Sequence, residues 1–267
     1  MKLFDSHAHI GAPELLADAP ALIARARDAG VEGMLAIGAG YGVGANAGAV
    51  MLAQEQAGVW AAVGVHPHDA DEWSELAATA LDGWLAAPRV VAVGECGLDY
   101  FYEHSRRGVQ REALAAQIGI ARAARRPLVI HVRPSRGSRD AFDELIEIFD
   151  RERAHELGGV IHCFTGDLPF ARACLERDFD ISFSGILTFK NADELRDVAR
   201  ALPLERLMIE TDTPLLAPTP HRGKRNEPAW VARVAECLAE VHGVSPAEVA
   251  ERTASRARAR FQLGAPG

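Results

Sequence analysis

LFDSHAHI, residues 3–10, combines the apolar side chains of a buried strand with one aspartate and two histidines. Side chains of a strand alternate between its two faces, so we expect His7 and His9 to share a face with Leu3 and Asp5. The opposite face, directed at covering helices, would carry Phe4, Ala8 and Ile10. Two imidazoles projecting from one strand can reach the same metal ion.

The same kind of apolar segment recurs along the chain and alternates with segments of helical period, as repeated strand–helix units do. The expected strands lie near Lys2–Ile10, Gly33–Ala39, Val59–Val65, Val90–Gly94, Pro127–Val132, Gly159–Phe164, Asp180–Ser184 and Leu207–Glu210. The expected helices lie near Glu14–Ala29, Ala45–Gln56, Glu72–Ala86, Gln110–Ala124, Asp140–His155, Pro169–Arg177, Ala192–Ala201, Pro228–His242 and Pro246–Gln262. Eight strands, each followed by a helix, predict an α/β fold, a closed (β/α)8 TIM barrel, with residues 1–267 as a single domain.

Composition restricts the class of protein. With 267 residues and 48% hydrophobic content, the chain can bury a large core. No apolar run approaches the roughly 18 residues of a membrane span, and polar residues interrupt any signal-peptide core at the N-terminus, so we expect a cytoplasmic protein. The net charge of −8 would repel nucleic acid, so a polyanion site would have to be local. The four cysteines form no CxxC pair, and we expect reduced thiols; Cys96 and Cys163, each beside a polar strand-end residue, should point away from the mouth and pack.

Polar residues recur at the ends of the predicted strands, where barrel enzymes carry their chemistry. Besides His7 and His9 they are Glu95, His131, His162, Glu210 and Asp212. Buried charges are costly unless they are paired or bind metal, so one metal centre explains them together. Histidine with carboxylate suits Zn²⁺, Mn²⁺, Fe or Mg²⁺. Four histidines and two carboxylates exceed the needs of one ion and match two ions about 3.5–4 Å apart, bridged by a carboxylate.

At these residues the chain resembles the TatD family of metal-dependent deoxyribonucleases, which are amidohydrolase-like barrels. The resemblance covers nearly the whole chain, in the motifs "DSHAHI", "GVHPHDA", "VGECGLDYFYEHSRRGVQREAL", "IHVR", "IHCFTG", "FSGILTFKNA" and "IETDTPLLAPTPHRGKRNEP". It implies one divalent ion (Mg, Mn or Zn) held by His7, His9, Glu95 and Asp212, and a second held by Glu95, His131 and His162. Glu95 would bridge the two ions. Asp212 would act as the general base, deprotonating a water whose pKa the ions lower.

The resemblance also implies the substrate, which is single-stranded DNA or a strand end cleaved as by a 3'-5' exonuclease. His66 matches a family position near the substrate phosphate, and a loop histidine that caps its neighbours is the alternative. His68 is interpreted as structural, and Asp99 and Glu210 as residues that orient ligands or arginines. Arg133 and the loop residues His221, Arg222 and Arg225 would bring positive charge to the mouth, unless that loop is simply solvated. The aromatics Tyr100, Phe101 and Tyr102 could stack on bases or pack at the rim.

Two other functions stay open. A small-molecule hydrolase could use the same centre on an amide, ester or phosphotriester, because fold alone does not select a substrate. A neutral substrate would leave Arg222 and Arg225 without a role. A metal-binding scaffold without activity is the third possibility, and it predicts a missing ligand, which the sequence does not show.

Overall fold

The computed structural model describes residues 1–263. Its strands are β1 (Leu3–Ala8), β2 (Val31–Ile37), β3 (Val59–Val63), β4 (Val90–Asp99), β5 (Leu128–Arg133), β6 (Gly159–Ile161), β7 (Phe179–Phe183) and β8 (Leu207–Ile209). They pair in parallel in the order β1 to β8. Beyond the last pair, the backbone N–H of His9 donates to the carbonyl of Thr213 (2.8 Å), which links β1 to the segment after β8 and nearly closes the ring. The predicted (β/α)8 barrel is confirmed.

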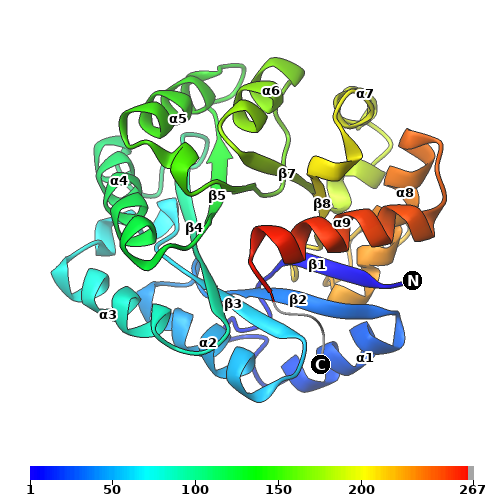
Figure 1. The fold of residues 1–267 in the computed structure, drawn as a ribbon, viewed down its shortest axis with the longest axis horizontal. Helices are drawn as coiled ribbons and strands as arrows, with labels where there is room; N and C mark the ends of the chain where they lie inside the picture. Colours follow the sequence, from blue (N-terminus) through cyan, green and yellow to red (C-terminus); the bar gives the residue numbers. More distant parts are fainter. Residues whose placement is uncertain (264–267) are drawn as a thin grey trace.

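Helices surround this ring of strands (Figure 1). They are α1 (Ala19–Asp28), α2 (Asn46–Glu55), α3 (Glu75–Leu85), α4 (Arg107–Ala124), α5 (Asp140–Arg151), α6 (Leu168–Glu176), α7 (Asp193–Arg200), α8 (Val231–His242) and α9 (Pro246–Arg260). In α5 four large apolar side chains recur at helical spacing and are buried: Phe142, Leu145, Ile148 and Phe149. Within residues 1–263 no helix is long and apolar enough to cross a membrane.

Two helices begin later than the sequence pattern predicts, and local structure explains why. The first helix was expected from Glu14 but begins at Ala19, because turns occupy the preceding residues and proline stands in its first turn. The third begins at Glu75, where the Ser74 hydroxyl accepts a hydrogen bond from the Ala77 N–H (3.2 Å). Residues Pro67–Glu72 form the 3-10 helix η2 instead.

Helix α9 closes the N-terminal end of the barrel. Ala254, Ala257 and Phe261 at its inner face belong to one apolar cluster with Phe4 of β1 and Met208 of β8. Figure 1 shows this helix lying across the strands rather than beside them. Phe4 therefore points into the barrel, and the expectation that it faces the surrounding helices is wrong. Leu3 takes that outer position and packs in the cluster that includes the helices α1 and α2.

Candidate metal centre

The polar strand-end residues lie together at the C-terminal mouth of the barrel. His7 and His9 come from the end of β1 and the residue after its bounds, Glu95 from β4 and His131 from β5. The others follow directly or closely after their strands: His66 after β3, His162 after β6 and Asp212 after β8. Because all strands are parallel, their carboxyl ends meet at this one edge of the barrel.

An irregularity in β1 turns the histidine pair inward. Strict alternation from Phe4 would point His7 outward, toward the helices. The pairing of β1 with β2 shifts register between Asp5 and Ala8. Before the shift Ser6 points inward, with its Oγ 2.9 Å from Ser182 Oγ, and after it Ala8 packs in the outer layer. The shift therefore places His7 on the inner side, where it is fully buried.

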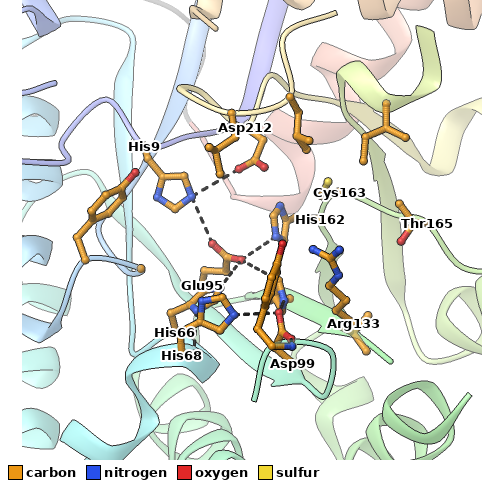
Figure 2. Close-up of a pocket in the computed structure, with 18 residues that line it drawn as sticks. His9, His66, His68, Glu95, Asp99, Arg133, His162, Cys163, Thr165 and Asp212 are labelled. Carbon is orange, nitrogen blue, oxygen red and sulfur yellow. Dashed lines mark hydrogen bonds and ion pairs between the residues drawn. The ribbon is translucent and has the colours of Figure 1, made fainter. Parts of the chain in front are cut away.

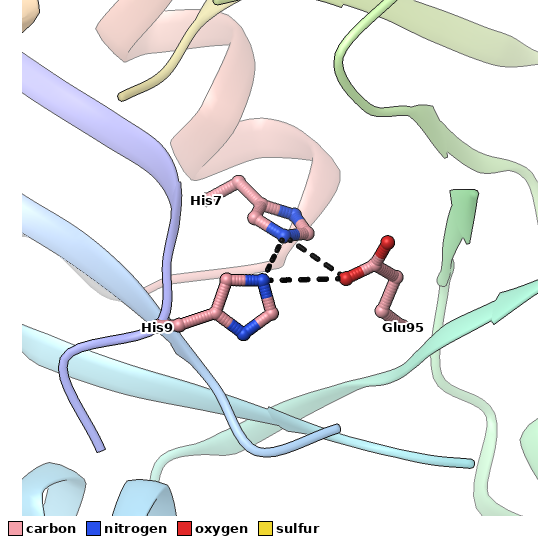
Figure 3. Close-up of side chains that lie close together, drawn as sticks. All are labelled: His7, His9 and Glu95. Carbon is pink, nitrogen blue, oxygen red and sulfur yellow. Dashed lines mark hydrogen bonds and ion pairs between the residues drawn. The ribbon is translucent and has the colours of Figure 1, made fainter. Parts of the chain in front are cut away.

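Glu95 is the centre around which the imidazoles gather. Its Oε1 lies 2.7 Å from His162 Nε2, 2.9 Å from His131 Nδ1 and 3.3 Å from His66 Nε2. Its Oε2 lies 3.2 Å from His7 Nε2 and 3.5 Å from His9 Nε2. Figure 3 shows the rings of His7 and His9 turned toward this oxygen. Five ring nitrogens thus surround one buried carboxylate.

Asp212 completes the cluster from the side opposite His66 (Figure 2). Its Oδ1 lies 3.6 Å from His9 Nε2 and 3.7 Å from His7 Nε2. Its backbone adopts a left-handed conformation with φ of 58°, and its N–H donates to the His7 carbonyl at 2.9 Å. The main chain therefore fixes this carboxylate over the histidine pair.

The donor set fits divalent cations. Three groups of ligand atoms are each mutually close enough to share an ion: His7–His9–Glu95, His7–His162–Asp212 and His66–Glu95–His131. The Nε2 atoms of His7 and His9 lie 3.2 Å apart, so both are close enough to bind the same cation. The Nδ1 atoms of both rings are buried without a protein partner. Imidazole with carboxylate is the ligand chemistry of zinc, manganese and iron sites.

The cluster holds its carboxylates ionised. Burial alone would raise the pKa of Glu95, but the imidazoles of His162, His66 and His7 lower it well below its ordinary value. Burial opposes ionisation of Asp212 too, and its hydrogen bond with His9 and the nearby imidazoles lower the pKa. Burial lowers the pKa of His66 to about 4, so this imidazole is neutral at pH 7. Burial opposes protonation of His9, His131 and His162 too, but the neighbouring carboxylates raise the pKa of all three. Because imidazole binds metal in its neutral form, metal binding would release protons from these rings.

A second layer of carboxylates orients the imidazoles. Asp99 Oδ2 lies 3.0 Å from both His131 Nε2 and His68 Nε2. Glu210 Oε1 lies 3.2 Å from His162 Nδ1 and accepts the Cys163 N–H at 2.7 Å. Such partners fix the ring orientation of a ligand and raise its basicity. The positions of Asp99 and Glu210 match the orienting roles expected from the sequence, and His68 contacts Asp99 rather than Glu95.

A pocket of about 670 Å³ opens above these residues. One wall carries Tyr41, whose ring lies 5.8 Å from that of His9. Another carries Leu215 and Leu216, and a third carries Arg133 (Figure 2). The Arg133 guanidinium lies over the ring of Tyr102 at 4.7 Å. It is the only lysine or arginine among the pocket-lining residues that the structure describes.

The structure does not bring the basic loop after β8 into this pocket. His221 stacks on Trp230, with ring centroids 4.0 Å apart. Arg222 lies over the Phe189 ring at 3.6 Å, and Arg225 pairs with Asp18 at 2.9 Å. Their contacts are made with neighbouring loops, and none of the three lines the space above Glu95.

Some pocket residues could not be found from the sequence, and one was misplaced. Tyr41 lies outside the quoted motifs, and Leu215 lies inside one without an assigned role, because a tyrosine or leucine in a loop is ordinary without its spatial context. Cys163 was expected to pack away from the mouth, and that expectation is wrong: it lines the pocket, with its Sγ 3.3 Å from Ser184 Oγ. The strand ends at Ile161, and the left-handed backbone of Cys163, with φ of 44°, interrupts the alternation. Tyr100 is buried, and its hydroxyl donates to Glu144, so it packs at the rim.

Comparison with known proteins gives concordant matches. The model of the family described as TatD related DNase matches residues 4–262. The uncharacterized metal-dependent hydrolase YabD of Bacillus subtilis is 38% identical over 261 residues, covering 98% of this chain and 99% of YabD. The 3'-5' ssDNA/RNA exonuclease TatD of Salmonella typhimurium is 34% identical over 266 residues, covering 98% of this chain and 99% of that protein. The crystal structure of YJJV, a TatD homolog of Escherichia coli, has a TM-score of 0.90 at 28% identity, covering 98% of this chain and 99% of that one.

Proposed function

This chain belongs to the TatD related DNase family and is a metal-dependent hydrolase of that type, and we propose that it hydrolyses phosphodiester bonds at the end of single-stranded DNA. The observation that carries the proposal is the convergence of five imidazoles and Asp212 around the Glu95 carboxylate. Clusters of this kind serve water activation in two-metal hydrolases. The relative in Salmonella typhimurium that is named a 3'-5' ssDNA/RNA exonuclease supports the choice of substrate and of polarity.

Two divalent ions fit the donor set, with magnesium, manganese and zinc as candidates. His7, His9 and Asp212 would hold one ion, His131 and His162 the other, and Glu95 would contact both, because its two oxygens face the two groups separately. Bound there, the ions would lower the pKa of a water molecule and neutralise charge on the phosphate. His66 reaches the same Glu95 oxygen as His131 and is available to either the ion or the substrate.

Asp212 is proposed as the general base. Its carboxylate is ionised because its hydrogen bond with His9 and the neighbouring imidazoles lower its pKa despite burial. Its left-handed backbone and its N–H bond to His7 hold it in place above the histidine pair. An ionised carboxylate fixed in this position can accept the proton of the attacking water at Oδ1.

Arg133 is proposed as the phosphate anchor. Its guanidinium faces the pocket, makes no ion pair with any described carboxylate, and rests on the aromatic rings of Phe101 and Tyr102. A cation held by ring faces keeps its N–H groups available for phosphate oxygens. His66, neutral because burial lowers its pKa to about 4, is the second candidate for a contact with the transferred phosphate.

A strand end suits the pocket better than the middle of a duplex does. The Glu95 carboxylate is 2% exposed and lies beneath the walls formed by Tyr41 and Leu215. A single strand can enter such a pocket end first, whereas the bulk of a duplex on either side of a scissile phosphate would meet these walls. Tyr102, which is 51% exposed at the rim, offers a ring face to a base.

A small-molecule ester or amide hydrolase is the second candidate. It is favoured by the apolar side of the pocket, where Val132, Ile186, Leu215 and Leu216 outnumber the single arginine. Such a wall would suit an acyl or aryl group. Under this alternative Arg133 has no anionic partner and its removal would not affect turnover of a neutral ester.

We further propose that residues 1–267 act as one domain in the cytoplasm. The barrel uses strands from Leu3 to Ile209, and helix α9 returns to pack on the first and last of them. All four cysteines are free thiols, which supports a reducing compartment.

The test compares substrates on the metal-loaded protein. After chelation and addition of Mg²⁺, Mn²⁺ or Zn²⁺, cleavage of end-labelled single-stranded DNA, of blunt duplex DNA and of a p-nitrophenyl ester panel is measured. We expect single-stranded DNA to be cleaved from one end, and Arg133→Ala to reduce kcat/KM on it by about 10- to 100-fold. Arg136→Ala, in the loop that follows β5 and outside the pocket lining, is the matched control. If no metal restores cleavage of any phosphodiester, the nuclease proposal is wrong.

A further inference from the structure

A second cavity of about 360 Å³ adjoins the metal pocket. Thr165 and Ile186 line both spaces, so the two cavities meet at these side chains. In Figure 2 Thr165 lies beyond Cys163 on the side away from His9. The second cavity runs between the segment after β6 and the segment that joins β7 to α7. A molecule too large for the metal pocket can extend in this direction.

The far end of this cavity carries an aromatic ring with a cation on it. Phe189 lines the cavity and is half-buried, and the Arg222 guanidinium lies 3.6 Å from its ring centroid. Arg222 is exposed and makes no ion pair among residues 1–263. Two hydrogen bonds hold its loop in place: the Thr219 N–H donates to Thr188 Oγ1 (2.9 Å), and the Thr219 hydroxyl donates to the Thr188 carbonyl (3.1 Å).

We propose that this second cavity binds a nucleobase of the DNA strand that extends from the metal pocket, with Arg222 on the phosphate beside that base. The inference rests on the proposed function and extends it from the reacting end of the strand to the part that remains bound. A base is flat and has a face that stacks on an aromatic ring irrespective of sequence. An arginine on the same ring supplies the charge for the adjoining phosphate.

The charges of the lining support a base rather than a phosphate inside the cavity. Asp167 and Glu194 both line it, and carboxylates repel phosphate. Asp167 is partly neutralised by the Arg139 guanidinium and accepts the Phe170 N–H at the start of α6 (2.9 Å). The remaining polar groups, among them Asn191, can hydrogen-bond to the edge of a base. No lysine or arginine is among the described residues that line the cavity: Arg139 is paired with Asp167, and Arg222 lies outside, on the Phe189 ring.

The experiment separates long from short substrates. Phe189→Ala and Arg222→Ala are assayed on a single-stranded 12-mer and on a p-nitrophenyl ester of thymidine monophosphate, which is too short to reach the second cavity. We expect each variant to raise KM for the 12-mer by about 5- to 20-fold, as loss of one stacked base does, with kcat within about twofold. Turnover of the short ester should not change. Arg225→Ala is the matched control, because it removes the same charge from the same loop where Asp18 already pairs with it.

A modified substrate tests the inference without altering the fold. Twelve-mers are made that each lack the base at one of the first few nucleotides. With the wild-type protein, KM should rise for the 12-mer that lacks the base bound in the second cavity. With Phe189→Ala, removal of that same base should raise KM no further. Equal losses on the 12-mer and on the short ester would overturn the inference, as would an unchanged KM for the 12-mer in both variants. If the wild-type protein cleaves the 12-mer while the variants match it, only this inference fails. If the wild-type protein cleaves no oligonucleotide, the proposed function fails with it.

Discussion

Two clusters of buried charge lie at opposite ends of the same barrel, and they are built differently. At the N-terminal end Asp180 is fully buried, and its oxygens accept from the Nε atoms of Arg206 (2.6 Å), Arg256 (2.7 Å) and Arg260 (2.7 Å). At the C-terminal mouth five imidazoles surround Glu95. Both ends contain buried carboxylates with several partners, so burial of charge alone does not identify the functional end.

The difference lies in whether the protein completes its own hydrogen bonds. No side-chain atom of Asp180 or of its three arginines is among the buried polar atoms without a partner in residues 1–263. At the mouth, three such atoms remain: His7 Nδ1, His9 Nδ1 and Glu210 Oε2. A self-sufficient cluster stabilises the fold. At the mouth, five ring nitrogens face the single Glu95 carboxylate, which is the arrangement of donors around a metal site rather than a complete set of hydrogen bonds. The N-terminal cluster therefore holds helix α9 on the barrel, and we propose that the cluster at the mouth binds ions.

The largest difference between the two clusters is expected in the effect of a substitution on activity. Glu95→Gln keeps the shape of the side chain but removes the charge that faces both groups of imidazoles. We expect turnover of single-stranded DNA to fall by about 10³-fold or more, since several kcal/mol of charge stabilisation depend on the ions it would hold. The measurement is kcat/KM under saturating metal. Residual activity within tenfold of wild type would show that Glu95 does not organise the centre.

At the other end the same type of substitution should act on stability. Asp180→Asn leaves three guanidinium groups around a neutral amide in a fully buried position. Breaking a buried ion pair costs about 3–5 kcal/mol, so the free energy of unfolding in urea should fall by that order. The kcat of the protein that remains folded should stay near the wild-type value. A loss of kcat without a loss of stability would reverse the assignment of the two clusters.

The orienting carboxylates at the mouth should give an intermediate effect. Asp99→Asn weakens the acceptor that fixes His131 through its Nε2 at 3.0 Å. Loss of such a partner lowers metal affinity by about 10- to 100-fold, which titration calorimetry with Mn²⁺ or Zn²⁺ would detect. His104→Ala, whose ring contacts His68 and Tyr102 but not Glu95, serves as the control. Equal affinities in Asp99→Asn and wild type would mean that the ring of His131 needs no such support.

The smallest effect concerns Asp178, the half-exposed partner of Arg260. Burial opposes ionisation of this carboxyl, but its hydrogen bond and charge interactions with Arg260 lower its pKa below the ordinary value of 3.8. A lowered pKa contributes stability above about pH 4, and that stability is lost as the pH falls through the folded-state value. Asp178→Asn should therefore cost at most about 1 kcal/mol at pH 7, because the pair is partly screened by water. The difference from wild type should vanish in urea unfolding near pH 2, and a difference that grows at low pH would contradict this sign.

The sequence predicts the barrel well because its evidence is local. Each strand–helix unit has its own apolar period, and the polar residues at the strand ends follow from chain order and from the shared edge of a parallel sheet. The convergence of residues as distant as His7 and Asp212 could be expected for this reason. The resemblance of the motifs to a known family then added the grouping of the ligands.

The features that could not be predicted from the sequence depend on breaks in the alternation of side chains along a strand and on contacts between residues far apart in the chain. The register shift between Asp5 and Ala8 puts His7 on the same inner side of β1 as Phe4, and alternation alone cannot reveal such a shift. The left-handed backbone at Cys163 turns that thiol into the pocket. Arg225 pairs with Asp18, a residue 207 positions away, so its charge is not directed at the mouth as its closeness to Asp212 in sequence suggested.

The central claim is that the mouth of the barrel binds two divalent ions and that the N-terminal cluster binds none. The direct test is to remove metal with a chelator, dialyse against excess Mn²⁺ or Zn²⁺, and count bound ions per chain by elemental analysis in three proteins. We predict two ions in the wild type, fewer than two in Glu95→Gln, and two in Asp180→Asn. A wild-type chain that binds no ion, or a Glu95→Gln chain that still binds two, would contradict the account.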